Sequence, residues 1–169
     1  VVFPAAVAWY VPCSCKLPRM YSSMTAIRPQ AATRVLVADD QPDVLEALRW
    51  LLTGEGYEPE FVSSTEGVLE RLRERPFDLL LMDLNYSRDT TSGREGLELI
   101  PQVRAHDPSM PIVVMTGWGS VDTAVEAMRL GAKSFVQKPW EDVTLLEIVQ
   151  REIEDAQASK RRDAKQQRE

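Results

Sequence analysis

Short, mostly apolar runs alternate with helix-spaced apolar residues along the chain from Arg34 onward. The pattern indicates five strands, at RVLVA (34–38), EPEFV (58–62), DLLLM (78–82), PIVVM (111–115) and KSFVQ (133–137). After each strand, apolar residues recur at helical spacing, with stops at Gly54 and before Pro76. Because crossovers between parallel strands are right-handed, we expect a doubly wound α/β domain, in which a five-stranded parallel sheet carries helices on both faces.

Polar residues stand at the carboxyl ends of four of the predicted strands. Asp39 and Asp40 follow the first strand, Asp83 the third, Thr116 the fourth and Lys138 the fifth. Ligands of open α/β sheets bind beyond these ends, so the side chains should converge on one rim. Like charges packed together need a counter-charge, and an ion of the size of Mg²⁺ with oxygen ligands supplies it.

The carboxylate at the end of the predicted central strand indicates which reaction the site can perform. Asp83 can act as a nucleophile towards phosphorus, while a bound metal would neutralise the phosphoryl oxygens and fix the in-line geometry. Lys138 would pair with one phosphoryl oxygen as a mobile point charge, and the Thr116 hydroxyl would donate a hydrogen bond to another. The backbone carbonyl of Asn85, two residues past Asp83, is a further candidate metal ligand.

The motifs VLVADD, LLLMD, VVMTG and FVQKP, in this order and spacing, resemble the receiver domain of two-component response regulators. Each motif alone is weak, since many strands end in Asp, but one at each of four strand ends is highly specific. The resemblance covers about residues 34–156. It implies a flavodoxin-like fold that takes a phosphoryl group from a sensor histidine kinase. Asp83 would be the acceptor, Asp39 and Asp40 would bind Mg²⁺ with it, and Lys138, usually before a cis proline, would complete the site.

The same resemblance implies a switch. Thr116 and Phe135 would be the coupled pair, in which phosphorylation of Asp83 draws Thr116 inward and Phe135 follows into the vacated space. The face made by the fourth helix, the fifth strand and the fifth helix would then change. The alternative for Phe135 is an ordinary core aromatic.

One departure from the family pattern lies after Asp83. Most receivers reach a Gly-Leu-Glu-Leu helix start through a short Met-Pro loop, whereas LNYSRDTTSGREGLEL (84–99) is a few residues longer and lacks the proline. Together with Trp140, directly after Pro139, this loop resembles receivers attached to activators of the alternative nitrogen-type sigma factor. Trp118, beside the predicted site, is either a gate or an exposed loop aromatic.

Composition and charge narrow the function classes. The 169 residues are 44% hydrophobic and 27% charged, as in a globular domain, and no apolar run reaches the roughly 18 residues of a membrane span. The two cysteines, one residue apart, support neither a disulfide framework nor a zinc site, so the cytoplasm is the expected compartment. Residues 34–158 carry a net charge of −12, which disfavours direct nucleic-acid binding and suits a divalent cation.

Both ends of the chain differ from the acidic middle. Residues 1–33 contain four prolines and no clear period, and we expect a disordered or artefactual leader. The stretch 157–169 is basic and is expected to be a linker towards an output domain that this sequence does not contain.

The last helix raises the question of a homodimer. It begins near Glu141 and carries a stripe at coiled-coil spacing, made of Leu146, Val149, Ile153 and Ala156. The stripe predicts that the helix extends past the domain, and the pattern ends by Lys160. A second copy would pair through this helix or through the face of the fourth helix, fifth strand and fifth helix. The alternative is that Leu146 and Val149 pack on the sheet of their own chain.

Two other function classes remain open. A Mg²⁺-dependent phosphatase of the haloacid-dehalogenase type also uses an Asp nucleophile and a Lys. It needs the nucleophile on the first strand and a second Asp two residues on, where this chain has Asn85. A degenerate receiver that docks a partner without phosphorylation is the other class, but such domains usually lose an acid or the lysine, and none is lost here.

Overall fold

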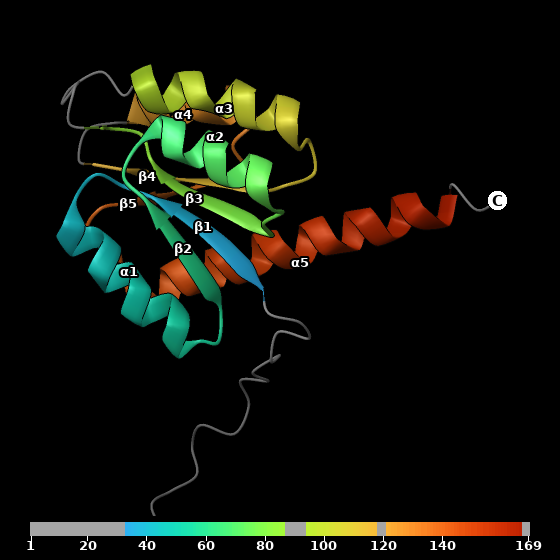
Figure 1. Cartoon of the computed structure of the whole chain (residues 1–169), viewed down its shortest axis with the longest axis horizontal. Coiled ribbons are helices and arrows are strands. Elements are labelled where there is room, and N and C mark those ends of the chain that lie inside the picture. Colours follow the sequence, from blue (N-terminus) through green and yellow to red (C-terminus); the bar gives the residue numbers. More distant parts are fainter. Residues whose placement is uncertain (1–32, 87–93, 118–120, 167–169) are drawn as a thin grey trace, which may run out of the picture.

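The computed structural model describes residues 33–86, 94–117 and 121–166. Strands and helices alternate through this part of the chain (Figure 1). In chain order they are β1 (Arg34–Ala38), α1 (Pro42–Gly54), β2 (Glu58–Val62), α2 (Thr65–Glu74), β3 (Leu79–Asp83), α3 (Arg94–His106), β4 (Ile112–Thr116), α4 (Val121–Leu130), β5 (Ser134–Gln137) and α5 (Asp142–Gln166). The predicted leader, apart from Thr33, lies outside the described residues, as do positions 87–93 of the long loop and Trp118.

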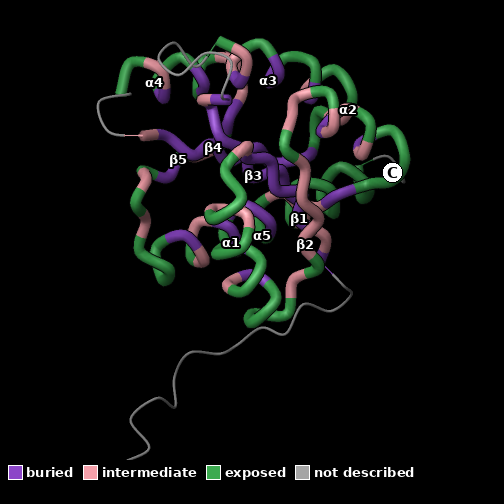
Figure 2. Tube along the Cα trace, turned by 60° about the vertical axis from the view of Figure 1, so that its left-hand side comes forward, coloured by how far each residue is buried: buried purple, intermediate pink, exposed green. Residues whose placement is uncertain are grey.

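All five strands are parallel and form one sheet in the order β2-β1-β3-β4-β5. Helices α1 and α5 cover one face, and α2, α3 and α4 cover the other (Figure 1). The central strand β3 is buried along its whole length, since it has a strand on each side and helices above and below (Figure 2). The predicted doubly wound α/β fold is confirmed.

Two apolar clusters lie on the two faces of the sheet. Alternate residues of a strand point to opposite faces, so Val35 and Val37 pack with α1 and α5, whereas Leu36 and Ala38 pack with the helices of the other face. Full burial of a side chain of Leu or Val size contributes about 1.5–3 kcal/mol. This packing holds the strands in place up to the residues where the polar side chains begin.

The strand boundaries agree with the predictions to within one residue. β1 and β2 have the predicted limits, β3 and β4 begin and end one residue later, and β5 begins at Ser134. Asp83 and Thr116 are therefore the last residues of their strands. A backbone hydrogen bond links the ends of these two strands, in which the Leu84 N–H donates to the Met115 carbonyl at 3.2 Å.

The last helix is longer than the sheet on which it packs. Val149 and Ile153 are buried in the core of their own chain and Leu146 packs against the same cluster, as in the alternative to the coiled coil. Residues 158–166 are exposed, and the helix projects from the body of the domain (Figure 1). The stretch expected to be a linker, 157–169, is therefore helical as far as Gln166.

Gly96 allows α3 to approach the end of β3. It is buried near the start of the helix, and a Cβ atom at this position would lie 2.6 Å from the Leu84 Cα and 2.7 Å from the Leu84 carbonyl oxygen. Both are backbone atoms, which cannot yield without moving the strand end. Since Leu84 follows Asp83 directly, this close approach helps to position the carboxylate of β3.

We expect Gly96→Ala to lower the free energy of unfolding by about 1–3 kcal/mol, because the added methyl group overlaps the Leu84 backbone. Gly54→Ala is the matched control: Gly54 also lies in a helix, and a Cβ there meets no atom within 4 Å. That change should be neutral or slightly stabilising. Urea unfolding followed by circular dichroism measures both variants, and equal stabilities would contradict the expected overlap.

Candidate functional site

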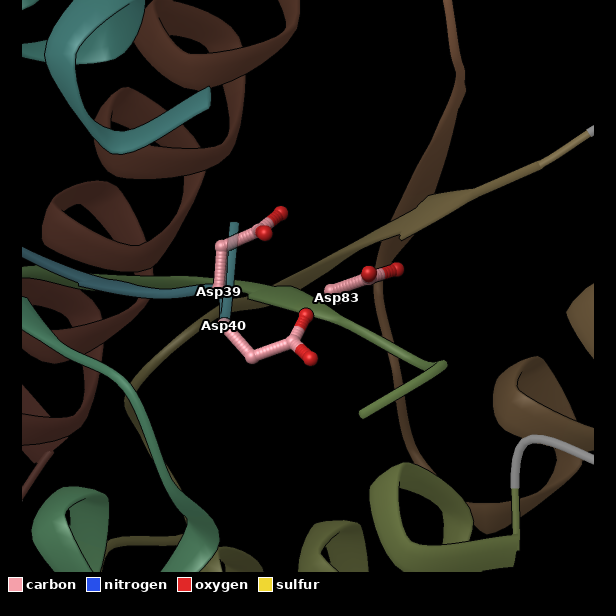
Figure 3. A group of neighbouring side chains, drawn as sticks. All are labelled: Asp39, Asp40 and Asp83. Atoms are coloured by element: carbon pink, nitrogen blue, oxygen red, sulfur yellow. The ribbon is translucent and has the colours of Figure 1, made fainter. Parts of the chain in front are cut away.

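Three carboxylates meet at the carboxyl end of the sheet (Figure 3). Asp39 and Asp40 follow β1, and Asp83 ends the adjacent strand β3. One oxygen atom of each carboxylate lies within 4.8 Å of the others. Asp39 and Asp83 are buried, whereas Asp40 is partly exposed. The structure thus brings the three predicted acids together.

Lys138 bridges two of these carboxylates. Its Nζ donates hydrogen bonds to Asp39 Oδ2 at 2.6 Å and to Asp83 Oδ2 at 3.0 Å. Its backbone N–H donates to the Thr116 carbonyl at 2.7 Å, which ties the end of β5 to the end of β4. The Lys138–Pro139 peptide is cis. Because only 16% of the lysine side chain is exposed, solvent screens these ion pairs less than it would at the surface.

Asp39 is also held by the start of α1. Its Oδ1 accepts the backbone N–H of Gln41 at 2.9 Å. Pro42 begins the helix, at a position where a missing N–H removes no intrahelical bond. Both oxygens of Asp39 therefore have donors, and the carboxylate is oriented by the protein itself. Such preorganisation is what a metal or phosphoryl site requires.

Asp83 lacks part of the compensation that a buried charge needs. Burial raises the pKa of its carboxyl above the usual range and the charge of Asp39 adds to this, although Lys138 acts in the opposite direction. Its Oδ1 is buried and makes no hydrogen bond of good geometry among the described residues, although the nearby backbone N–H of Asn85 also lowers the pKa of the carboxyl. An unpaired buried acceptor of this kind costs about 1–3 kcal/mol.

The donor set fits a divalent metal. Three carboxylates share one ammonium in this cluster, so negative charge is in excess, and all the free ligand atoms are oxygens. Oxygen ligands at the end of a sheet are the type of site that Mg²⁺ occupies. The residues present therefore fit the Mg²⁺ that the family resemblance implies.

A cavity of about 300 Å³ opens beside the carboxylates. It has room for a phosphoryl group with a hydrated ion, since a water molecule takes roughly 30 Å³. Asn85, expected to offer its carbonyl, is in the wall. The full lining is Asp40, Gln41, Asp83, Asn85, Tyr86, Gly117 and Lys138.

The two predicted switch residues lie on neighbouring strands. Thr116 ends β4 and is buried, directly before Gly117 in the cavity wall. Phe135 lies in β5, in register with Val114, and is 50% exposed. That exposure excludes the alternative in which Phe135 is a core aromatic.

Tyr86 is a residue of the cavity that the sequence analysis did not single out. It is 5% exposed, and its hydroxyl is buried without a hydrogen-bond partner among the described residues. Burial raises the pKa of the phenol, and nearby carboxylates, first that of Asp83, raise it further, so the hydroxyl keeps its proton at neutral pH. The signal in the sequence is its place three residues after Asp83.

Comparison with known proteins identifies the family. Residues 35–150 match the response regulator receiver domain, and the chain belongs to this family. Response regulator protein FleR of Pseudomonas aeruginosa is 38% identical over 120 residues, which are 71% of this chain and 24% of that protein. Transcriptional regulatory protein FixJ of Bradyrhizobium diazoefficiens is 31% identical over 130 residues, which are 77% of this chain and 61% of that protein. The chain thus spans about a quarter of FleR and less than two thirds of FixJ.

Solved structures agree with this assignment. NtrX from Brucella abortus in complex with ADP superposes with a TM-score of 0.73 at 26% identity, over 79% of this chain and 30% of that one. A CheY-like response regulator receiver domain protein from Methanospirillum hungatei JF-1 superposes with a TM-score of 0.69 at 26% identity, over 76% of this chain and 99% of that one. The recognition of a receiver domain from four strand-end motifs is confirmed. Within the described ranges, no helix has both the length and the apolar character to cross a bilayer.

Asp83→Asn should stabilise the metal-free protein at neutral pH. Because burial raises the pKa of Asp83 in the folded state, the stability that this group contributes is lost as pH rises from its ordinary value of 3.8 through the raised folded value. Removing the charge removes that penalty. A gain of about 1 kcal/mol raises the Tm of a domain of this size by about 2–4 °C, measured by thermal unfolding in EDTA between pH 4 and 8.

The gain should shrink towards pH 4, where the carboxyl of the parent becomes protonated. Asp155→Asn, at an exposed position of α5, controls for the loss of one negative charge. An Asp83→Asn protein less stable than the parent at pH 7 would mean that the ion pair with Lys138 outweighs the cost of burial.

Proposed function

We propose that this chain is the phosphoacceptor receiver domain of a response regulator. It takes a phosphoryl group from a sensor histidine kinase onto Asp83 and switches the surface seen by a partner or an output domain, in the control of transcription and in the cytoplasm. The observation that carries the proposal is the joint geometry of Asp39, Asp40, Asp83 and Lys138 at the ligand-binding end of a receiver fold. The similarity to transcriptional regulatory proteins supports the downstream role.

Transfer would proceed by in-line attack. A carboxylate oxygen of Asp83 forms the new P–O bond as the P–N bond to the kinase histidine breaks, and the leaving nitrogen keeps the electron pair and takes up a proton. Lys138, now paired with Asp83 Oδ2, would turn its charge to a phosphoryl oxygen, and the Thr116 hydroxyl would donate to another. Asp39, Asp40, Asp83 and the Asn85 carbonyl would hold Mg²⁺. When bound, this ion supplies neutralising charge for the phosphoryl oxygens.

The phosphoryl group would act at a distance through Thr116 and Phe135. Thr116 moves towards the new oxygens, and the half-exposed ring of Phe135 turns into the space that it leaves. The face of α4, β5 and α5 would change as a result. Apolar side chains are already exposed on it, at Val121, Val125 and Met128 along α4 and at Phe135 on β5, which supports a contact surface for another protein.

A second copy is one candidate for that contact. The predicted homodimer uses either this face or the last helix. Val149 and Ile153 are buried in their own core, which favours the face of α4, β5 and α5. Placement among the receivers of nitrogen-type sigma-factor activators stays a proposal, based on the long loop and Trp140. Direct nucleic-acid binding is not part of the proposal, because residues 34–158 are strongly acidic.

Intact mass tests the acceptor. After incubation with acetyl phosphate and MgCl₂, the parent should gain one phosphoryl group, and EDTA should abolish the gain. Asp83→Asn should gain none, whereas the control Asp155→Asn should behave as the parent does. Lys138→Ala should react about 10²-fold more slowly, the cost of removing one donor to the developing charge.

The outcomes separate the candidate functions. A gain in both the parent and Asp83→Asn would place the acceptor elsewhere. No gain in a folded parent would favour the docking module that works without phosphorylation, and the long connection between β3 and α3 would be the first feature to examine.

Fluorine NMR tests the switch. In protein made with 4-fluorophenylalanine, Mg²⁺ with beryllium and fluoride, a mimic of the phosphoryl group, should shift the Phe135 resonance and reduce its difference between H₂O and D₂O, because the ring becomes buried. Phe135→Leu assigns the resonance. Phe77, 3% exposed and two residues before β3 at the opposite end of the sheet, is the internal control. A resonance of Phe135 that stays in place while the site is loaded would contradict the switch.

A further inference from the structure

The Tyr86 hydroxyl has no task in the transfer step described above. The residue is 5% exposed, and its hydroxyl finds no partner among the described residues. Buried hydroxyls in folded proteins are nearly always paired, with protein or with ordered water. An unpaired phenol at the edge of a charged site therefore calls for a specific role.

Tyr86 stands in a wall that two cavities share. One is the cavity of about 300 Å³ beside Asp83. The other, of about 650 Å³, is lined by the start of α2 and by residues of α3 that include Glu95 and Glu98. Asp40 is the other residue common to both linings. Tyr86 and Asp40 thus border both the carboxylate site and a second, acidic cavity.

The two carboxylates after β1 are held differently. Asp39 is fixed by Gln41 on one oxygen and by Lys138 on the other. The side chain of Asp40 is partly exposed and makes no hydrogen bond within the part of the chain that the structure describes. A metal ligand without an orienting partner binds weakly, because metal binding must then also order the ligand side chain.

We propose that Tyr86 is a positioning residue for the metal site, whose hydroxyl holds the Asp40 carboxylate in its binding orientation through a bridging water. A phenol can donate to a water that in turn donates to a carboxylate. Tyr86 follows the end of β3 and Asp40 follows the end of β1, so the bridge links two neighbouring strand ends. The inference rests on the proposed function only for the identity of the ion, since it concerns the protein before phosphorylation.

Tyr86→Phe removes the hydroxyl and keeps the ring. We expect the affinity for Mg²⁺ to fall about tenfold, the usual effect of losing the partner of a metal ligand. Isothermal titration of MgCl₂ into the metal-free, unphosphorylated protein measures it, and the spin resonance of free Mn²⁺ gives a second readout. Tyr57→Phe is the matched control: Tyr57 is partly buried against the cluster on the α1 and α5 face, and its loss should leave the affinity unchanged.

A double-mutant cycle shows whether Tyr86 acts through Asp40. Asp40→Asn lowers the affinity by itself, and in that background Tyr86→Phe should change it less than about twofold. The metal-free Tyr86→Phe protein should stay folded, since the ring and its packing are kept and only the hydrogen bond to the bridging water is lost; a merely structural role would lower the stability and leave the affinity for Mg²⁺ unchanged. An affinity of Tyr86→Phe within twofold of the parent, or equal losses in both backgrounds, would overturn the inference.

The inference and the proposed function fail separately. A parent that binds Mg²⁺ through Tyr86 and Asp40 but gains no phosphoryl group would keep the inference and refute the proposed function. A parent that gains a phosphoryl group while Tyr86→Phe binds Mg²⁺ normally would refute the inference alone. A parent that binds no Mg²⁺ would overturn both.

Discussion

The bridge from one ammonium to two buried carboxylates is the interaction on which the rest of the site depends. Lys138 reaches from the end of β5 to Asp39 after β1 and to Asp83 at the end of β3, and its backbone is bonded to the end of β4. One residue thus connects four strand ends. Since a single positive charge cannot neutralise three carboxylates, the site is well positioned and electrically incomplete. An added cation or phosphoryl group therefore changes the charge balance and the side-chain contacts of this site strongly.

The buried apolar sheet stabilises the backbone that carries this charged cluster. Strands β1, β3 and β4 are buried almost throughout, and the acids begin only where the strands end. The core therefore holds the backbone rigidly while the polar side chains repel one another at the rim. Such electrostatic repulsion at a functional site is tolerated because the packed core around it stabilises the fold. Gly96 adds to this by letting α3 lie against the segment after Asp83.

The strands and the three acids could be predicted from the sequence because their signals are local. A run such as VLVADD shows both the buried strand and the point where it stops. The shift of β3 and β4 by one residue could not, since the last ladder bonds depend on the neighbouring strand. The exposure of Phe135 and the unpaired hydroxyl of Tyr86 depend on packing between distant segments, and a single sequence carries no record of it. The extension of α5 past the domain could be predicted as far as the apolar stripe runs, whereas its continuation from Lys160 to Gln166 could not, because residues 160–166 lack an apolar period, although Ala, Lys, Arg and Gln among them are good helix formers.

The projecting end of α5 behaves as a lever. Between Ile153, its last buried residue, and Gln166 the helix is about 20 Å long, at about 1.5 Å per residue. A small tilt of α5 on the sheet therefore becomes a larger sweep at the far end. Each residue also turns the helix by about 100°, so the number of residues sets the direction in which an attached segment would face. A phosphoryl group added at the rim of the sheet, as proposed above, would in this way change the angle at which the helix projects.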